Sequence, residues 1–281
     1  MEEKKEKHYL QNVILKGNCL ELMRYIPSHS VDLILADPPY GTLNRSNPDA
    51  QWDKEVDLKA LWYSYKRIIK PNGAILLFGQ GLFAAKLIMS NPKWFRYDLV
   101  WDKDRKSNFL NCKKMPMRQH EQVLVFYDKP PTYNPQMVFA GRWKWNHSRG
   151  NQEKEQTNNC FGKIRAVETI ISDYKYPGTI VRFPKGHSRQ DMLHPTAKPV
   201  NLLRWLIRTY SNEGDLVLDS FAGSGSTLIA AIEEKRDFIG IELSERYFEI
   251  CKKRVAERLM QPKLRLQRKK YIITERKTLK G

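Results

Sequence analysis

The tetrapeptide Asp37-Pro38-Pro39-Tyr40 directly follows a short apolar strand and strongly constrains how this chain can fold. Branched and apolar residues fill most of positions 31–35, which is typical of a buried strand. The two prolines donate no backbone hydrogen bond, so the strand has to end there. We therefore expect Asp37 and Tyr40 at the carboxyl end of a strand, where open α/β sheets place their ligands. Taken alone, the tetrapeptide is also compatible with an ordinary boundary between a strand and a turn, which is the less favoured interpretation.

Strand patterns alternate with helix patterns along most of the chain, which predicts a doubly wound, mostly parallel α/β sheet. Besides the strand at 31–35, we expect strands at 12–16, 74–78, 94–101, 122–127, 215–219 and 238–242. Apolar residues at helical spacing predict helices at 19–25, 57–69, 81–90, 199–207 and 244–257.

This alternation breaks down between residues 129 and 190, where the sequence is polar and rich in Gly, Asn and Pro. We expect a target-recognition insert at 129–190, because long structureless loops in compact domains are uncommon unless they are functional. The alternative is that these residues form a long surface loop without a role in recognition. The remaining parts are a catalytic half at 8–128, a cofactor-binding half of the same domain at 191–260, and a basic tail at 261–281.

The chain is strongly basic, with 49 Lys and Arg against 31 Asp and Glu, a net charge of +18 and a pI near 9.7. Such an excess favours a polyanionic partner such as nucleic acid, although solubility alone could also explain it. Basic residues stand among aromatic ones in the insert, a pattern suited to phosphate contact and base stacking. Candidate DNA-binding residues are Arg142, Trp143, Lys144 and Trp145 in the insert and Arg105, Lys113, Lys114 and Arg118 in a basic loop at 103–118. For the tail, contact with DNA and a solvated end are both open.

Cysteines and histidines show no metal-binding spacing. The four cysteines, Cys19, Cys112, Cys160 and Cys251, are scattered, which argues against a zinc site and a disulfide framework and fits a reducing cytoplasm. No apolar run reaches the length of a membrane span, and the N-terminus lacks the apolar core of a signal peptide.

A second strand, at 215–219, runs into a glycine turn that could bind a nucleotide-like ligand. Gly223 and Gly225 let a ligand approach the backbone, and exposed amides open the helix that follows. A dinucleotide fold would have a third glycine where this chain has Leu228, which disfavours NAD. Glu242, at the end of the next strand, can accept hydrogen bonds from two ribose hydroxyls. A nucleoside with a charged tail, S-adenosylmethionine, fits these features.

Together these motifs resemble an amino-group DNA methyltransferase of the β class. The resemblance covers residues from about 16 to about 258, and the catalytic tetrapeptide precedes the cofactor turn as in that class. It implies a seven-stranded, Rossmann-like methyltransferase sheet, S-adenosylmethionine as cofactor and double-stranded DNA as substrate. The matching motifs are Asp37-Pro38-Pro39-Tyr40, His194-Pro195-Thr196-Ala197-Lys198-Pro199, Asp219-Ser220-Phe221-Ala222-Gly223-Ser224-Gly225-Ser226-Thr227, and Gly240-Ile241-Glu242 with Tyr247.

The resemblance also assigns roles within the cofactor site. It places Thr196 and Lys198 at the carboxylate end of the cofactor and Glu242 at the ribose. Asn18 departs from the family pattern, which has Asp after Gly, so contact with the cofactor's adenine and simple helix capping are both open for it. The remaining implied cofactor contacts are Asp37, Asp219, Phe221, Ala222, Gly223, Gly225 and Ser226.

The reaction itself explains why the tetrapeptide is needed. The lone pair of an exocyclic amine on a base is delocalised into the ring, so the amine is a poor nucleophile. Hydrogen bonds from this amine to the Asp37 carboxylate and the Pro38 carbonyl would draw the nitrogen towards tetrahedral geometry. Pro38 and Pro39 fix the direction of that carbonyl. Tyr40 would stack on the target base once the base is flipped out of the duplex.

The expected activity is methylation of adenine N6, because Asp at the first tetrapeptide position favours adenine within this resemblance, whereas Ser is commoner in cytosine-N4 enzymes. Cytosine-N4 methylation is the alternative. Cytosine-C5 methylation is disfavoured, because it needs a cysteine nucleophile and no cysteine here follows a proline.

A different class of function is also open: the chain could be a catalytically inactive DNA-binding regulator. An RNA or protein methyltransferase is a less favoured alternative. We expect the chain in the cytoplasm of a bacterium or a phage-infected host. The resemblance also admits a homodimer and a cognate restriction endonuclease as partners.

Overall fold

The structure is a computed structural model that describes residues 10–41, 54–140, 156–158, 162–164, 173–184, 197–261 and 272–275 of the chain. It divides into two compact units. The larger unit comprises Met1–Asn134 and Thr179–Gly281, and the smaller one Pro135–Gly178. The predicted insert at 129–190 is wider than the smaller unit, because its two ends belong to the larger one.

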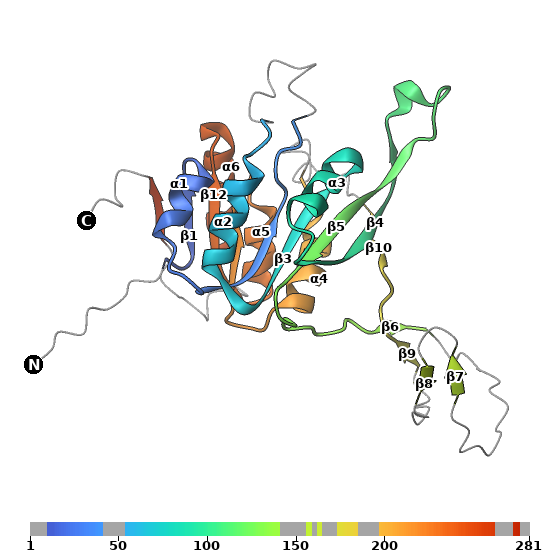
Figure 1. The fold of residues 1–281 in the computed structure, drawn as a ribbon. Coiled ribbons are helices and arrows are strands. Elements are labelled where there is room, and N and C mark those ends of the chain that lie inside the picture. Colours follow the sequence, from blue (N-terminus) through green and yellow to red (C-terminus); the bar gives the residue numbers. More distant parts are fainter. Residues whose placement is uncertain are drawn as a thin grey trace, which may run out of the picture. The chain divides into compact units, whose positions relative to one another are not determined.

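The larger unit contains the strands and helices that position the site (Figure 1). Its strands are β1 (Val13–Lys16), β2 (Val31–Ala36), β3 (Ile69–Gly79), β4 (Phe95–Ser107), β5 (Arg118–Phe126), β10 (Ile180–Arg182), β11 (Leu216–Asp219), β12 (Asp237–Glu242) and β13 (Ile272–Glu275). Its helices are α1 (Cys19–Leu22), η1 (Met23–Tyr25), α2 (Leu58–Ile68), α3 (Gly81–Ser90), η3 (Phe109–Asn111), α4 (Val200–Tyr210), α5 (Ser226–Glu233) and α6 (Glu245–Met260).

These nine strands form one sheet in the order β10-β4-β5-β3-β2-β11-β12-β1-β13. Only β5 runs antiparallel to its neighbours, β3 and β4, and the other pairs are parallel. The predicted doubly wound, mostly parallel fold is therefore confirmed. The seven predicted strands form the centre of the sheet, and the two edge strands β10 and β13 are additional. They were missed because β10 has only three residues and β13 is a four-residue run, Ile272–Glu275, inside a tail that was interpreted from its basic charge alone.

Strand β2 is buried on both faces, as the apolar run at 33–36 predicts. Leu33 and Leu35 pack into one core cluster, whereas Ile34 and Ala36 pack into the other. Helices α4, α5 and α6 supply side chains to the first cluster, and α1, α2 and α3 to the second. The helices thus cover both faces of the sheet, which is visible in Figure 1. Because side chains alternate along a strand, this burial fixes the register of β2 and with it the position of Asp37.

The smaller unit contains two short antiparallel pairs. Strand β6 (Val138–Phe139) pairs with β9 (Tyr174–Lys175), and β7 (Gln156–Asn158) pairs with β8 (Gly162–Ile164). In the part of the chain that the structure describes, no helix has both the length and the apolar character needed to cross a membrane.

The turn between β11 and α5 depends on glycine at residue 225. Gly225 has φ +82°, and a Cβ atom there would lie 2.7 Å from the sulfur of the buried Cys251 on α6. The left-handed conformation and the close approach of α6 therefore both exclude a side chain.

We expect Gly225→Ala to lower the free energy of unfolding by about 2–4 kcal/mol, from backbone strain and from the clash with Cys251. Gly214→Ala is the matched control, because Gly214 has φ +86° but no atom within 4 Å of the added Cβ. Gly214→Ala should lower the free energy of unfolding by about 1 kcal/mol, from backbone strain alone. Urea unfolding of both variants measures the difference, and equal losses would rule out the steric contribution of Cys251.

Candidate active site

A cavity of about 800 Å³ opens at the carboxyl ends of β2, β11 and β12. The tetrapeptide lines one side of this cavity. The glycine turn after β11 lines another side, together with Glu242 at the end of β12. Parallel strands bring these segments together, because their carboxyl ends meet at one edge of the sheet. The tetrapeptide and the glycine turn, which are far apart in the sequence, therefore share one cavity.

The Asp37 carboxylate is held through both of its oxygens. The Lys198 ammonium lies 2.5 Å from Oδ2, and the Tyr40 hydroxyl donates a hydrogen bond of 3.0 Å to Oδ1. Burial raises the pKa of Asp37, while the nearby charge of Lys198 acts to lower it. The carboxylate therefore depends on Lys198 to stay ionised and on Tyr40 to stay oriented.

Lys198 belongs to a row of alternating charges that runs away from Asp37. Its ammonium lies 3.3 Å from Glu121 Oε2, and Lys103 lies 3.2 Å from the other carboxylate oxygen of Glu121. The side chains of both lysines are only 9% exposed. Burial acts to raise the pKa of Glu121, but attraction to the two lysines outweighs it, so that pKa is lowered. The pKa of Lys198 is raised despite burial, because Asp37 and Glu121 both stabilise its charge.

Tyr40 is supported by an aromatic neighbour from α3. Its ring stacks on that of Phe83, with 4.6 Å between centroids and an interplanar angle of 27°. The side chain of Phe83 is buried in the core. Tyr40 therefore has a rigid backing, which suits a ring that has to hold another planar group.

The glycine turn is organised by two buried carboxylates. Glu242 Oε2 accepts a hydrogen bond of 2.7 Å from the amide of Gly223, and Oε1 accepts one of 2.8 Å from the amide of Ser244. Asp219 accepts a hydrogen bond of 3.0 Å from the amide of Phe221, and burial raises the pKa of Asp219 to about 7. This set fits a nucleoside with a cationic tail, since the carboxylates can accept from hydroxyl and ammonium groups beside a turn with little steric bulk.

Most of the predicted site residues line this cavity. Asn18 also caps α1, because its side-chain oxygen accepts a hydrogen bond of 2.9 Å from the amide of Leu20, so the capping alternative is confirmed. Lys198, predicted at the carboxylate end of the cofactor, also lines the cavity, and its ammonium pairs with Asp37 and Glu121. The predicted residues that line the cavity are Asn18, Asp37, Pro38, Pro39, Tyr40, Arg118, Lys198, Asp219, Phe221, Ala222, Gly223, Ser226 and Glu242.

The remaining predicted residues lie elsewhere. Gly225 faces Cys251 on α6, Arg105 is exposed on β4, and Lys113 and Lys114 are exposed on the segment that joins β4 to β5. Thr196, Arg142, Trp143, Lys144 and Trp145 lie outside the described residues.

Three residues of the site were not anticipated. Lys103 and Glu121 come from the neighbouring strands β4 and β5, and Phe83 comes from α3. A charged residue just before the apolar run 122–127 was the signal for Glu121, but the pairing of its strand was needed to find its partners. Within the described ranges, no group of three or more His, Cys, Asp or Glu residues is arranged to hold a metal ion.

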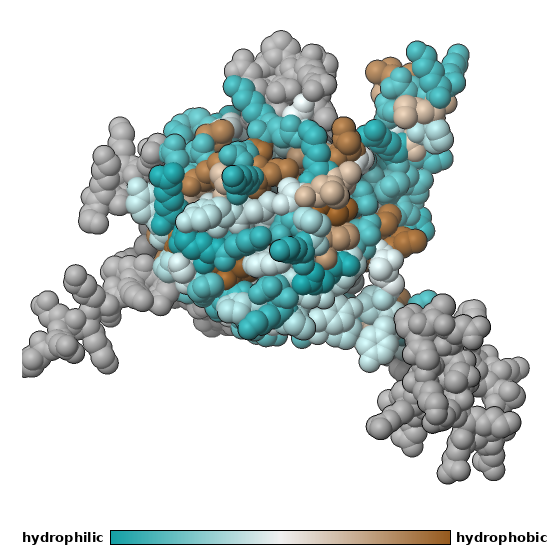
Figure 2. All heavy atoms as spheres, viewed as in Figure 1, coloured by the Kyte–Doolittle hydropathy of each residue, from teal (hydrophilic) through white to brown (hydrophobic). Residues whose placement is uncertain are grey.

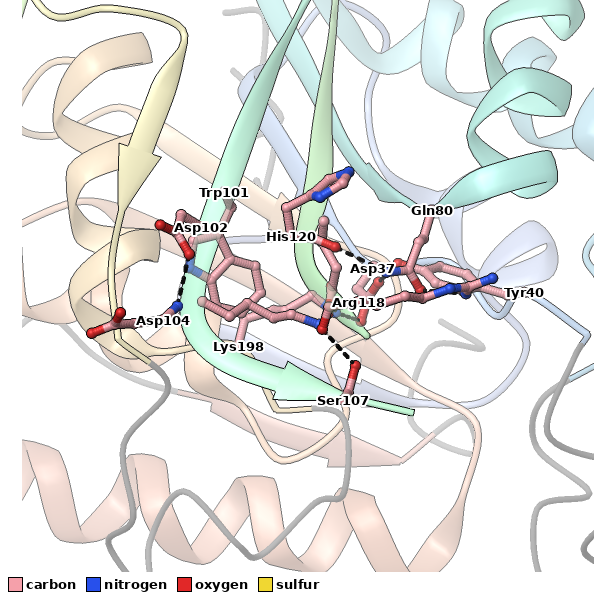
Figure 3. A network of polar contacts seen from close by, with 12 residues as sticks. Asp37, Tyr40, Gln80, Trp101, Asp102, Asp104, Ser107, Arg118, His120 and Lys198 are labelled. Atoms are coloured by element: carbon pink, nitrogen blue, oxygen red, sulfur yellow. Dashed lines mark hydrogen bonds and ion pairs between the residues drawn. The ribbon is translucent and has the colours of Figure 1, made fainter. Parts of the chain in front are cut away.

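The paired ends of β4 and β5 form one wall of the cavity. Arg118 donates a hydrogen bond of 3.1 Å to the side-chain oxygen of Gln80, and its carbonyl accepts one of 3.1 Å from Ser107. Figure 3 shows Arg118 and Gln80 on the same side of the network as Asp37 and Tyr40. The basic segment predicted to contact DNA thus begins at the cavity itself.

Comparison with known proteins identifies relatives of this arrangement. The chain is 32% identical over 273 residues to the type II methyltransferase M.HinfI of Haemophilus influenzae, which covers 88% of this chain and 68% of that protein. It is 29% identical over 255 residues to the DNA adenine methyltransferase YhdJ of Escherichia coli (strain K12), covering 86% of this chain and 82% of the relative.

Solved structures share the fold. The PvuII DNA methyltransferase, which is cytosine-N4-specific, matches with a TM-score of 0.61 and 18% identity over 90% of this chain and 88% of its own. The M1.HpyAVI–SAM complex matches with a TM-score of 0.55 and 22% identity over 89% of this chain and 100% of its own. A family model described as DNA methylase, for N6 and N4 methyltransferases, matches residues 31–253. The chain therefore belongs to the N6/N4 amino-group DNA methyltransferase family, which uses S-adenosylmethionine.

Proposed function

We propose that this chain methylates the N6 amine of adenine at a specific sequence in duplex DNA, after flipping the base out of the helix. The observation that carries the proposal is the position of Asp37 and Pro38 in the cavity that the glycine turn also lines. S-adenosylmethionine supplies a methyl group bound to a positively charged sulfur. The protein has to bring the amine to that methyl group in line, and two bound reactants need no further encounter.

The contacts of Asp37 leave room for the amine. A carboxylate has about four lone-pair positions. In the structure Oδ1 accepts from Tyr40 and Oδ2 pairs with Lys198, so each oxygen retains a lone pair for an N–H of the base. The Pro38 carbonyl would accept the second N–H. Asp37 need not remove a proton before the transfer, because the methylated amine becomes acidic and can lose its proton afterwards.

Adenine is proposed over cytosine for two reasons. The tetrapeptide begins with Asp, and the relative YhdJ is named as a DNA adenine methyltransferase. The cytosine-N4 enzyme from the PvuII system shares the fold at 18% identity, which makes N4 methylation the alternative outcome. We place the reaction in the bacterial cytoplasm, since the two relatives come from Haemophilus influenzae and Escherichia coli.

Sequencing the DNA of an expressing host with detection of modified bases tests this proposal directly. The expected result is N6-methyladenine in one recurring sequence context. N4-methylcytosine in its place would show that the target base is cytosine. Unmodified DNA that the purified protein still binds would indicate an inactive regulator.

Asp37→Asn should reduce methyl transfer at least about 100-fold, because the neutral amide cannot polarise the amine as a carboxylate does. Binding of S-adenosylmethionine should change little, since the shape of the cavity is kept. Tritium incorporation into unmodified DNA and calorimetric titration of the cofactor measure the two effects. Full activity of this variant would refute the proposed role of Asp37.

The pH dependence of transfer should respond in opposite directions to two charge changes beside Asp37. Lys198 acts to lower the pKa of Asp37 and Glu121 acts to raise it. If transfer needs the ionised carboxylate, activity is lost as pH falls through that pKa. Lys198→Met should therefore move the acidic limb of kcat/KM to higher pH, and Glu121→Gln should move it to lower pH.

Lys198→Arg is the control for this experiment, since it keeps the charge and should restore most of the wild-type profile. A shift of both Lys198→Met and Glu121→Gln in the same direction would indicate general disruption of the site instead of a change in the charge around Asp37.

A further inference from the structure

The segment joining β4 to β5 projects from the larger unit and carries two solvent-exposed apolar side chains at its tip. Phe109 is 70% exposed and Leu110 is 83% exposed, among the most exposed large apolar residues that the structure describes. Figure 1 shows the β4–β5 pair extending beyond the rest of its unit, and Figure 2 shows hydrophobic atoms at the end of this projection. Adjacent apolar side chains in such a position mark an interaction surface more often than chance exposure.

The backbone of this tip is ordered by its own polar groups. Asn108 adopts a left-handed conformation (φ +69°), and its side-chain oxygen accepts a hydrogen bond of 2.7 Å from the side chain of Asn111. The amides of Lys114 and Met115 donate to the carbonyl of Asn111 at 2.9 and 3.0 Å. Polar side chains thus hold the turn, while Phe109 and Leu110 point outward without packing on the body. The tip presents them as a preformed wedge.

The flanks of the wedge are basic. The segment 103–118 has six basic residues and one acidic residue. Arg105, Lys106, Lys113 and Lys114 are all exposed, and none forms an ion pair with another residue that the structure describes. An apolar tip between exposed cations matches a polyanion with an apolar interior, which is the chemistry of stacked bases between phosphate chains. A second copy of the chain fits poorly, because each copy carries a net charge of +18.

The wedge begins at the rim of the active-site cavity. Ser107 and Arg118, paired at the root of the tip, both line the cavity that holds Asp37. Phe109 follows Ser107 by two residues, so its Cα lies within about 7 Å of that lining residue. Successive base pairs are about 3.4 Å apart, so this distance corresponds to about two base steps. A duplex whose target base enters the cavity would therefore meet the wedge at or beside the vacated position.

We propose that Phe109 and Leu110 enter the base stack of the DNA beside the flipped nucleotide, while the four basic residues around them contact the phosphates. The tip then replaces part of the stacking that the duplex loses when the target base leaves. This inference rests on the proposed function, since it assumes that the base is extruded for methylation.

The test compares three double variants on a short duplex that carries the modified sequence found in the host DNA. Phe109→Ala with Leu110→Ala removes the wedge. Lys113→Ala with Lys114→Ala removes charge from the same tip. Tyr63→Ala with Met89→Ala is the matched control, because these side chains are equally exposed, at 76% and 73%, but lie on α2 and α3.

Removing the wedge should weaken DNA binding about 10-fold without changing how steeply affinity falls with salt, since no phosphate contact is lost. Removing the two lysines should reduce the slope of log affinity against log salt by about 2. The control pair should bind as the wild type does. Unchanged DNA affinity in the wedge variant would overturn the proposal. If sedimentation then showed that the variant had lost a dimer, the tip would be assigned to contact between copies.

Methyl transfer provides the second readout. The wedge variant should lose about 10- to 100-fold in rate on a fully paired site, and recover to within about 3-fold of wild type when an abasic site stands opposite the target base, because extrusion then costs less. Equal losses on both duplexes would refute a role in base flipping. If the wild type methylates no DNA, the proposed function fails and insertion beside a flipped base fails with it. Weaker binding of a mixed-sequence duplex by the wedge variant, with the control pair unchanged, would then still assign the tip to DNA contact.

Discussion

The ion pair between Lys198 and Asp37 is the contact on which the active site depends. It joins residues 161 positions apart, one after β2 and the other just before α4. A buried carboxylate left without this partner would tend to take up a proton and lose its ability to polarise an amine. Glu121 and Lys103 extend the pair into a row of alternating charges, which lowers the cost of placing Lys198 where its side chain is only 9% exposed. The charge of the Asp37 carboxylate is thus maintained by residues from three separate segments.

The same arrangement explains how one edge of the sheet serves two ligands. Strands β11 and β12 end at Asp219 and Glu242, which order the glycine turn, while β2 ends at the tetrapeptide. Beyond β3, the antiparallel strands β4 and β5 leave this edge as a long projection with basic flanks and an apolar end. The cofactor cavity, the carboxylate proposed to bind the amine and the surface proposed to enter DNA therefore follow one another along the sheet.

The sequence was sufficient for the fold class and for the local motifs, because these depend on residues close together in the chain. The apolar run before Asp37 and the glycines after β11 determine their strands and turns through local backbone chemistry, and the seven central strands were all predicted. Edge strands β10 and β13 were not, since three- and four-residue strands in polar surroundings are defined by the neighbour with which they pair. The smaller unit, Pro135–Gly178, likewise has narrower bounds than the predicted insert.

What the sequence by itself determined was the chemistry: a carboxylate and a carbonyl for an amine, a glycine turn for a nucleoside, and basic charge for DNA. Only the tertiary structure decided the partners of those groups. It paired Lys198 with Asp37, set Phe83 behind Tyr40, and brought Glu121 between two lysines. Side-chain charges act over a few ångströms in space regardless of their separation in the chain, so these pairings depend on strand order and register, which emerge only when the whole sheet is assembled.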